Sequence, residues 1–101
     1  MWLMAMFDLP VKSKDDRRAY TRFRHALIRS GFAMLQFSVY ARFLPSEEAS
    51  AIYRKIVHAA LPPGGEVRLM AITDHQYGKM EIYFGKKRKP VESPPDQLGL
   101  F

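Results

Sequence analysis

The apolar and polar positions of the chain fall into blocks that predict four strands. Residues 1–7 are continuously apolar, which is typical of a strand buried on both faces, and Pro10 requires that strand to end before it. Residues 34–43 alternate with a period of two, which predicts one strand with an apolar face and a mixed, polar face. Residues 66–73 are rich in Val, Leu, Met and Ile and predict a third strand, and residues 80–84 predict a short fourth strand.

A helix is expected to begin at Ser13, between the first two strands. Asp16 follows three residues later, as in a capping box, and Gly31 is suited to end the helix. The positions expected to face the core recur at helical spacing and are Tyr20, Phe23 and Leu27.

A second helix is expected after Pro45 and Ser46. Residues 62–65 read Pro-Pro-Gly-Gly and predict a turn, and residues 74–79 are expected to form a loop. The predicted core stripe of this helix comprises Ile52, Tyr53, Ile56 and Ala60.

In outline, these elements are interpreted as the ferredoxin-like βαββαβ plan of an α+β protein. Two helices cover one face of a four-stranded antiparallel sheet in that plan. The other face would carry Met, Tyr and Phe side chains, which favour a partner chain over water. Residues 1–89 are expected to form the domain and residues 90–101 a tail that supplies an added strand.

The composition limits the class of protein. The 101 residues suffice for one domain, and 48% of them are hydrophobic, which is enough for a packed core. The absence of cysteine excludes disulfides and thiolate metal sites. The longest apolar run, residues 1–7, is far shorter than the roughly 20 residues of a membrane span. We therefore expect a soluble cytoplasmic protein.

The charge of the chain favours a polyanionic partner. Sixteen Lys and Arg residues against ten Asp and Glu residues give a net charge of +6, which is typical of proteins that bind nucleic acid. Phosphate groups require repeated cations along a rigid path, and the first helix offers such a path; the alternative is an ordinary solvated helix face. The candidate nucleic-acid-binding residues of this helix are Lys14, Arg17, Arg18, Arg22, Arg24 and Arg29.

A second basic run at residues 86–89 adds Lys86, Lys87 and Arg88 as candidates, although Lys residues beside a strand also serve solubility. The segment from Tyr77 to Phe84 carries only part of an RNA-recognition pattern, so an RNA-binding module remains a rival interpretation. The three histidines lack metal-ligand spacing, and no phosphate-binding glycine loop or nucleophile elbow occurs.

Asp8 is an acid at the point where the first strand ends. An Asp beside a proline commonly caps a turn. Mg²⁺, however, takes oxygen ligands, usually one or two carboxylates with waters and phosphate oxygens. A dimer with a two-fold axis would bring two copies of Asp8 to one metal ion. The residues alone leave both interpretations open.

Three segments together resemble the second core CRISPR-associated protein, the small partner of the spacer-acquisition integrase. They are "FDLP" at residues 7–10, "YTRFRHALIRSGF" at residues 20–32 and "QFSVYARF" at residues 36–43. The resemblance is strongest over residues 1–44, and the form of these motifs resembles members that accompany type II effector systems. It implies a homodimer joined through its sheets, which lies along captured duplex DNA as a scaffold between two integrase dimers.

The resemblance also implies chemistry. Members of this family are described as metal-dependent endoribonucleases or DNases, with the acid at the end of the first strand as the Mg²⁺ ligand. That position is Asp8 here, and the metal would be shared by the Asp8 residues of two subunits. Ser38 and Tyr40 match the second-strand motif, where packing near the dimer seam is the expected role. The family's basic region matches here at Lys14, Arg17, Arg18 and Arg22.

Three functions therefore stay open. The first is a scaffold for spacer acquisition that binds double-stranded DNA, and we rank it first as the physiological role. The second is a stand-alone nuclease that uses paired Asp8 residues, with DNA or single-stranded RNA as substrate. The third is a toxin-type ribonuclease on the same fold. Asp8→Asn separates the first two, because a scaffold keeps duplex binding whereas a nuclease loses cleavage.

The tail ends in Leu98, Leu100 and Phe101, whose apolar side chains favour docking into a groove. They are expected to add a strand to the sister subunit or to the integrase partner. The last five residues, "QLGLF", also resemble the short peptides with which bacterial replication and repair proteins bind the sliding clamp.

Overall fold

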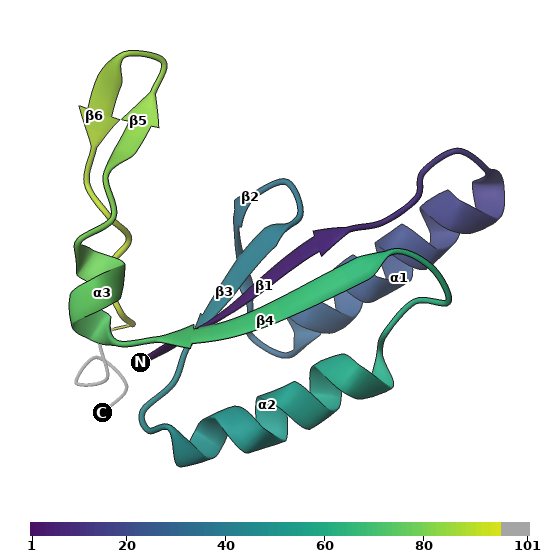
Figure 1. Ribbon diagram of the computed structural model, residues 1–101, viewed down its shortest axis with the longest axis horizontal. Coiled ribbons are helices and arrows are strands. Elements are labelled where there is room, and N and C mark those ends of the chain that lie inside the picture. The colour runs from purple at the N-terminus through teal and green to yellow at the C-terminus, as the bar shows by residue number, and fades with distance from the viewer. Residues whose placement is uncertain (96–101) are drawn as a thin grey trace.

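The computed structural model of the chain describes residues 1–95 and confirms the ferredoxin-like order β1α1β2β3α2β4 (Figure 1). A short helix and a strand pair follow this unit along the chain. The elements are β1 (Trp2–Asp8), α1 (Lys14–Arg29), β2 (Ala33–Gln36), β3 (Val39–Phe43), α2 (Glu48–Ala59), β4 (Glu66–Ile72), α3 (Asp74–Gly78), β5 (Ile82–Phe84) and β6 (Lys87–Lys89).

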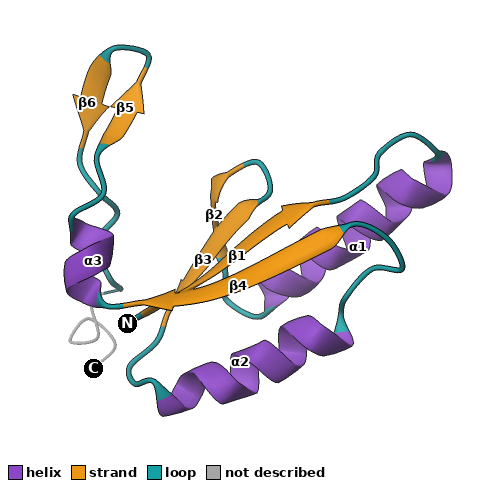
Figure 2. Cartoon of the chain, viewed as in Figure 1, coloured by secondary structure: helices purple, strands orange, loops and turns teal. Residues whose placement is uncertain are grey.

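The main sheet has the strand order β2-β3-β1-β4, and all three neighbouring pairs are antiparallel (Figure 2). β1 thus lies inside the sheet, as its continuous apolar sequence predicts. Its odd-numbered residues Leu3, Ala5 and Phe7 are buried in one core cluster together with side chains of α1 and α2. Trp2 and Met4 are buried in a second cluster on the opposite face, which we call the outer face.

The predicted first helix is confirmed. The Ser13 side chain accepts a hydrogen bond from the Asp16 N–H, and the Asp16 carboxylate accepts one from the Ser13 N–H, so the capping box is complete. Phe23 and Leu27 are buried against the sheet. Gly31 ends the helix with a φ of +86°, a conformation that favours glycine.

The prediction of one strand over residues 34–43 is wrong. The segment forms the β2–β3 hairpin, whose turn at Phe37 and Ser38 reverses the chain. The period-two alternation continues across the reversal, so the pattern does not reveal the turn. The face expected to be mixed and polar also carries Tyr40, which is buried in the core beneath the helices and not at the outer face.

The predicted core stripe of α2 is wrong in two positions. The side chains of Ile52 and Ile56 are exposed, whereas Val57 is buried and Tyr53 packs against the core. The side chains of α2 that do face the core also recur at helical spacing and are Ala49, Tyr53, Val57 and Ala60.

The C-terminal third departs from expectation after β4. Residues 80–84 do not supply the sheet's fourth strand, because β5 pairs only with β6 among the described residues. Most of the expected loop at residues 74–79 is α3, which Thr73 and Gln76 begin with a second capping box. Figure 1 shows the β5–β6 pair, which we call the C-terminal ribbon, projecting away from the main sheet.

Candidate metal ligand and nucleic-acid interface

Asp8 lies at the exposed end of β1, on the outer face of the sheet. Side chains alternate along a strand, so Asp8 shares its face with Met4 and Met6 rather than with Phe7. Among the described residues, Asp8 takes part in no ion pair with a side chain or terminus. Its carboxylate is therefore accessible to a cation from solution or to a second copy of the chain.

Glu66 is the cross-strand neighbour of Asp8, which the sequence did not reveal. The two residues face each other in the β1–β4 register, and residues directly opposite in an antiparallel pair project from the same face. Glu66 accepts a hydrogen bond from Arg68 Nε at 2.6 Å, and this contact raises the pKa of Arg68. Only knowledge of the register could have brought Glu66 to attention.

One chain does not supply a complete metal centre. Within residues 1–95, no three His, Cys, Asp or Glu side chains are grouped so that they could hold an ion. Asp8 and Glu66 offer two neighbouring carboxylates, and the second is engaged by Arg68. The arrangement fits a Mg²⁺ ion that keeps most of its waters and is completed by a phosphate or by a second subunit.

The backbone around Asp8 is closely packed. A β-carbon on Gly65 would lie 2.6 Å from the Asp8 carbonyl oxygen, and Gly65 has a φ of +86°. The next residue, Leu9, is buried in the main core. The start of β4 therefore fixes the end of β1, and only glycine fits at position 65 without displacing it.

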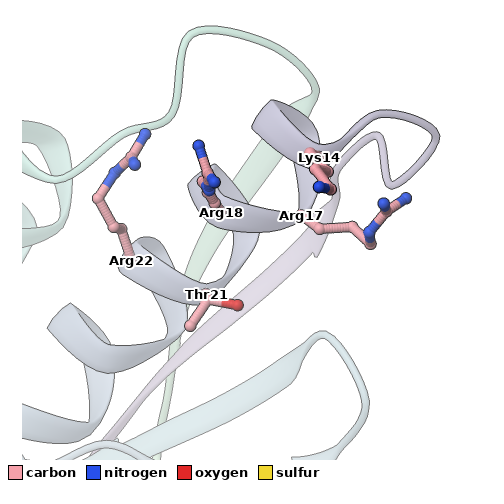
Figure 3. Close-up of a pocket in the computed structure, with 5 residues that line it drawn as sticks. All are labelled: Lys14, Arg17, Arg18, Thr21 and Arg22. Atoms are coloured by element: carbon pink, nitrogen blue, oxygen red, sulfur yellow. The ribbon is translucent and has the colours of Figure 1, made fainter.

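Four of the predicted basic residues gather on α1. Figure 3 shows that their side chains project from α1 itself, with Arg18 and Arg22 pointing the same way. Arg18 lies 3.8 Å from Asp15, and both side chains are largely exposed, so this pair neutralises little of the positive charge. Arg24 and Arg29 lie further along the helix. The shallow open pocket here, which we call the α1 basic surface, is lined by Lys14, Arg17, Arg18, Thr21 and Arg22.

Arg17 differs from its neighbours because its guanidinium already has partners. Its Nη1 donates to the carbonyl oxygens of Val11 and Lys12, at 3.2 and 3.1 Å. Both carbonyls belong to the loop that connects Asp8 to α1. Arg17 thus fastens this loop in the free protein, a role that the basic pattern of the helix could not reveal.

The α1 basic surface and Asp8 point to opposite sides of the molecule. The core side of α1 packs on the sheet face that carries Phe7, so the cations of the helix face solvent beyond the helix layer. Asp8 projects from the outer face instead. The α1 basic surface and the Asp8 carboxylate are therefore two separate candidate sites in a single chain.

The C-terminal ribbon carries the second basic run. Lys86, Lys87 and Arg88 are exposed on it, and Figure 1 shows the ribbon far from the N-terminal end of α1. Gly85, with a φ of +65°, opens its two-residue turn. Glu81 accepts a hydrogen bond from the Tyr83 hydroxyl and lies 4.0 Å from Arg88. The ribbon cations therefore do not join those of α1 in one chain.

Part of the outer face is covered by α3. The ring of Trp2 stacks on that of Tyr77 with centroids 3.9 Å apart, and the Tyr77 hydroxyl donates to Glu92. Burial raises the pKa of Tyr77, and the bond to Glu92 raises it further. The Met1 amine pairs with Asp74 at the start of α3. Tyr77 is thus not available for base stacking, whereas Tyr83 and Phe84 of the same segment are exposed.

The rest of the outer face is open, with apolar side chains beside the charged Asp8, Glu66 and Arg68. Met70, opposite Met4, is 46% exposed, and Phe37 in the hairpin turn is 87% exposed. A cavity of about 300 Å³ separates this face from the base of the C-terminal ribbon and is lined by sheet residues such as Leu35 and Val39. Such a surface is suited to contact with another chain.

The apolar end of the predicted tail lies outside the described residues. Leu98, Leu100 and Phe101 lie outside them, so their docking stays a prediction. None of the helices within residues 1–95 is long and apolar enough to cross a membrane.

The chain is similar in sequence to known proteins. The family model described as "CRISPR associated protein Cas2" matches residues 1–80. The chain is 48% identical to the CRISPR-associated endoribonuclease Cas2 of Parvibaculum lavamentivorans over the full length of both proteins. It is 46% identical to the protein of the same name from Paracidovorax avenae, with all of this chain and 94% of the relative aligned.

A solved structure supports the fold. Streptococcus pyogenes Cas2 at pH 6.5 superposes with a TM-score of 0.62, covers 83% of this chain and all of that one, and is 13% identical in sequence. At that identity the likeness concerns the fold alone. The family match and the full-length relatives establish that the chain belongs to the CRISPR-associated protein Cas2 family.

Proposed function

We propose that the chain is a spacer-acquisition subunit of a CRISPR system that works in the cytoplasm as a dimeric scaffold on duplex DNA. The carrying observation is the α1 basic surface, whose cations face solvent on a rigid helix. Phosphate contacts of this kind position a protein on DNA without reading sequence. The integrase dimers bridged by the scaffold, and the type II effector system suggested by the motifs, are parts of the same proposal.

The homodimer is proposed to form through the outer face. Met70 exposes apolar area there, Phe37 exposes more in the β2–β3 turn, and a small domain gains stability by covering such a surface. A two-fold axis near Met6 would bring the Asp8 carboxylates of two subunits toward each other. The described residues 90–95 contain no strand, so an added strand would have to come from the ribbon or from residues beyond 95.

We further propose a Mg²⁺-dependent endonuclease activity, with RNA as the first substrate to test because the relatives are named endoribonucleases. Asp8 would hold the metal, and Glu66 lies beside it as a second carboxylate. A bound Mg²⁺ ion neutralises charge on a phosphodiester and activates water for hydrolysis. The chain's own residues would hold the Asp8 end of β1 in place for that ion: Gly65 admits the close approach of β4, and Arg17 fastens the following loop.

A stand-alone nuclease is the second candidate. The observation in its favour is that Asp8 and the α1 basic surface face opposite sides, so hydrolysis at Asp8 does not depend on duplex bound at α1. A toxin-type ribonuclease would use the same site. A separate proposal concerns the tail residues Leu98, Leu100 and Phe101. They would dock on a sister subunit, on the integrase or on the sliding clamp, and Phe101→Ala would abolish that docking.

The test compares wild type, Asp8→Asn and the double variant Arg18→Gln/Arg22→Gln, with Lys55→Gln on α2 as a control for the loss of a surface charge outside α1. Cleavage of single-stranded RNA and duplex DNA is measured with and without Mg²⁺, and duplex binding and integrase co-purification are measured in parallel. We expect Asp8→Asn to lose cleavage only and the arginine variant to lose duplex binding only. Duplex binding by the arginine variant equal to that of Lys55→Gln would refute the scaffold proposal.

A further inference from the structure

Ser38 has a backbone conformation that is rare for its residue type. Its φ is +66°, and it is the one non-glycine residue with a positive φ in the part of the chain that the structure describes. L-residues seldom adopt this left-handed region, and such outliers persist where the surroundings hold them, often beside functional sites. Ser38 lies in the β2–β3 turn, next to the end of β1.

Two hydrogen bonds hold Ser38 in place. Its carbonyl oxygen accepts from the Phe7 N–H at 3.0 Å, which extends the β1–β3 pairing by one step beyond Met6. Its hydroxyl lies 3.0 Å from the Tyr20 hydroxyl of α1 in a partly buried contact. Ser38 therefore connects the hairpin turn, the helix and the residue that precedes Asp8.

Tyr20 is itself held in place. Its ring packs edge-on against the Phe7 ring, with centroids 5.8 Å apart, and it lies on the core side of α1. Phe7 is thus held by two contacts: its N–H donates to Ser38, and its ring packs against Tyr20. These contacts fix the β3 side of the strand end, while Gly65 and Glu66 fix the β4 side.

We propose that Ser38 is a positioning residue for the Asp8 carboxylate, acting through Phe7 and held in its left-handed conformation by Tyr20. The inference rests on the proposed metal-dependent nuclease function. Loss of the hydroxyl contact lets the turn relax toward ordinary φ values and releases the Phe7 N–H. The Asp8 side chain then samples orientations that hold a divalent cation less well.

The experiment uses Ser38→Ala, Tyr20→Phe and the double variant, which remove one or both hydroxyls of the same hydrogen bond. Ser46→Ala and Tyr83→Phe serve as matched controls, because they remove hydroxyls far from Asp8, and Asp8→Asn serves as the negative reference. Binding of Mn²⁺ to the free protein is followed by electron paramagnetic resonance, and the Mg²⁺ dependence of RNA cleavage is measured alongside.

We expect each single variant to weaken Mn²⁺ binding about tenfold, in line with losses seen when a group that orients a metal ligand is removed. The Mg²⁺ concentration for half-maximal cleavage should rise by a similar factor, while duplex binding at α1 stays unchanged. The double variant should be no worse than either single variant, because both remove one interaction. Should Ser38→Ala fold poorly, Tyr20→Phe carries the test, since it removes a single oxygen atom.

The outcomes separate this inference from the function on which it rests. Wild type that binds no more Mn²⁺ than Asp8→Asn refutes the metal site itself. Wild-type binding that is lost in Asp8→Asn but kept in both Ser38→Ala and Tyr20→Phe overturns the positioning role alone. Equal weakening in the matched controls would also overturn it, because the effect would then not depend on the contact near Asp8.

Discussion

The guanidinium carbon of Arg42 lies 4.2 Å from the ring centroid of Tyr53, and the same side chain donates a hydrogen bond to the Tyr53 hydroxyl. This pair joins β3 to α2 beneath the helices. Arg42 also reaches the C-terminal end of α1, where a β-carbon on Gly31 would lie 2.6 Å from its Nη1. A cation at a helix C-terminus interacts favourably with the helix dipole. Among the described residues Arg42 has no acidic partner, so the end of α1 is the negative group nearest to hand for its charge.

Gly31→Ala should lower the free energy of unfolding by more than the about 1–2 kcal/mol that a left-handed L-residue costs. The new methyl group must also displace Arg42 from its place. Urea denaturation measures the loss. Gly85→Ala is the control, because its φ is also positive but no atom lies within 4 Å of the added carbon. An equal loss in the two variants would show that the Arg42 contact adds nothing.

Gly65→Ala should be more harmful than either, with a loss of about 3 kcal/mol. The atoms in the way are the Asp8 carbonyl oxygen and the Leu9 α-carbon, which belong to the backbone and cannot rotate aside. The same variant should weaken divalent-cation binding, because it moves Asp8. Thermal and urea melts measure the first effect. A variant as stable as Gly85→Ala would contradict the packing described for the strand end.

Val57→Ala should destabilise the protein by about 2 kcal/mol, whereas Ile52→Ala should change stability by no more than about 0.5 kcal/mol. The reason is burial: the side chain of Val57 is 1% exposed and that of Ile52 is 62% exposed. Paired urea melts compare them directly. A larger loss of stability in Ile52→Ala than in Val57→Ala would instead support the core stripe expected from the sequence, in which Ile52 faces the core.

The stability of the protein should fall at alkaline pH partly through Tyr77. Burial and the bond to Glu92 raise its pKa in the folded state, so the protonated form is favoured by folding. Below about pH 10 both states hold the proton and the stabilisation is complete. Above that pH the unfolded chain loses the proton first, and the free energy of unfolding declines. Tyr77→Phe should therefore show a shallower decline between pH 9 and 11 in urea melts.

Arg17→Gln should affect DNA binding less than Arg18→Gln. Arg18 has only an exposed, loose pair with Asp15, so its loss should reduce the salt-dependence slope of duplex binding by about 0.9, the value for one phosphate contact. Arg17 already donates to Val11 and Lys12, so its slope change should be smaller and its melting temperature lower. Binding titrations at several salt concentrations distinguish the two. Identical slopes would mean that Arg17 leaves the loop when DNA binds.

The elements that the sequence predicted well are those with local causes. The capping box of Ser13 and Asp16 acts within four residues, and the spacing of Phe23 and Leu27 follows from helix geometry alone. The place of Asp8 at the end of the first strand followed from Pro10, two residues later, and from the continuous apolar run before it. These features need no knowledge of what packs where.

The features that escaped prediction depend on contacts between distant segments. The pairing of Asp8 with Glu66 is set by the β1–β4 register, and a shift of one residue would have placed Glu66 on the other face. The hairpin turn at Ser38 contains no glycine that would have marked it in the sequence. Hydrogen bonds to Tyr20 and Phe7 hold Ser38 in the left-handed conformation that glycine would adopt without such contacts. Likewise, the residues around Trp2 in the sequence give no sign that its ring stacks on Tyr77.

The position of β1 inside the sheet has a consequence for the order in which the chain folds. Its β4 partner is synthesised only after α2, so the sheet cannot close until most of the domain has left the ribosome. The stacking of Trp2 on Tyr77 can form only later still, because Tyr77 follows β4 in the sequence. Trp2 is the only tryptophan of the chain, so its fluorescence reports on a late step, the packing of α3 against the sheet.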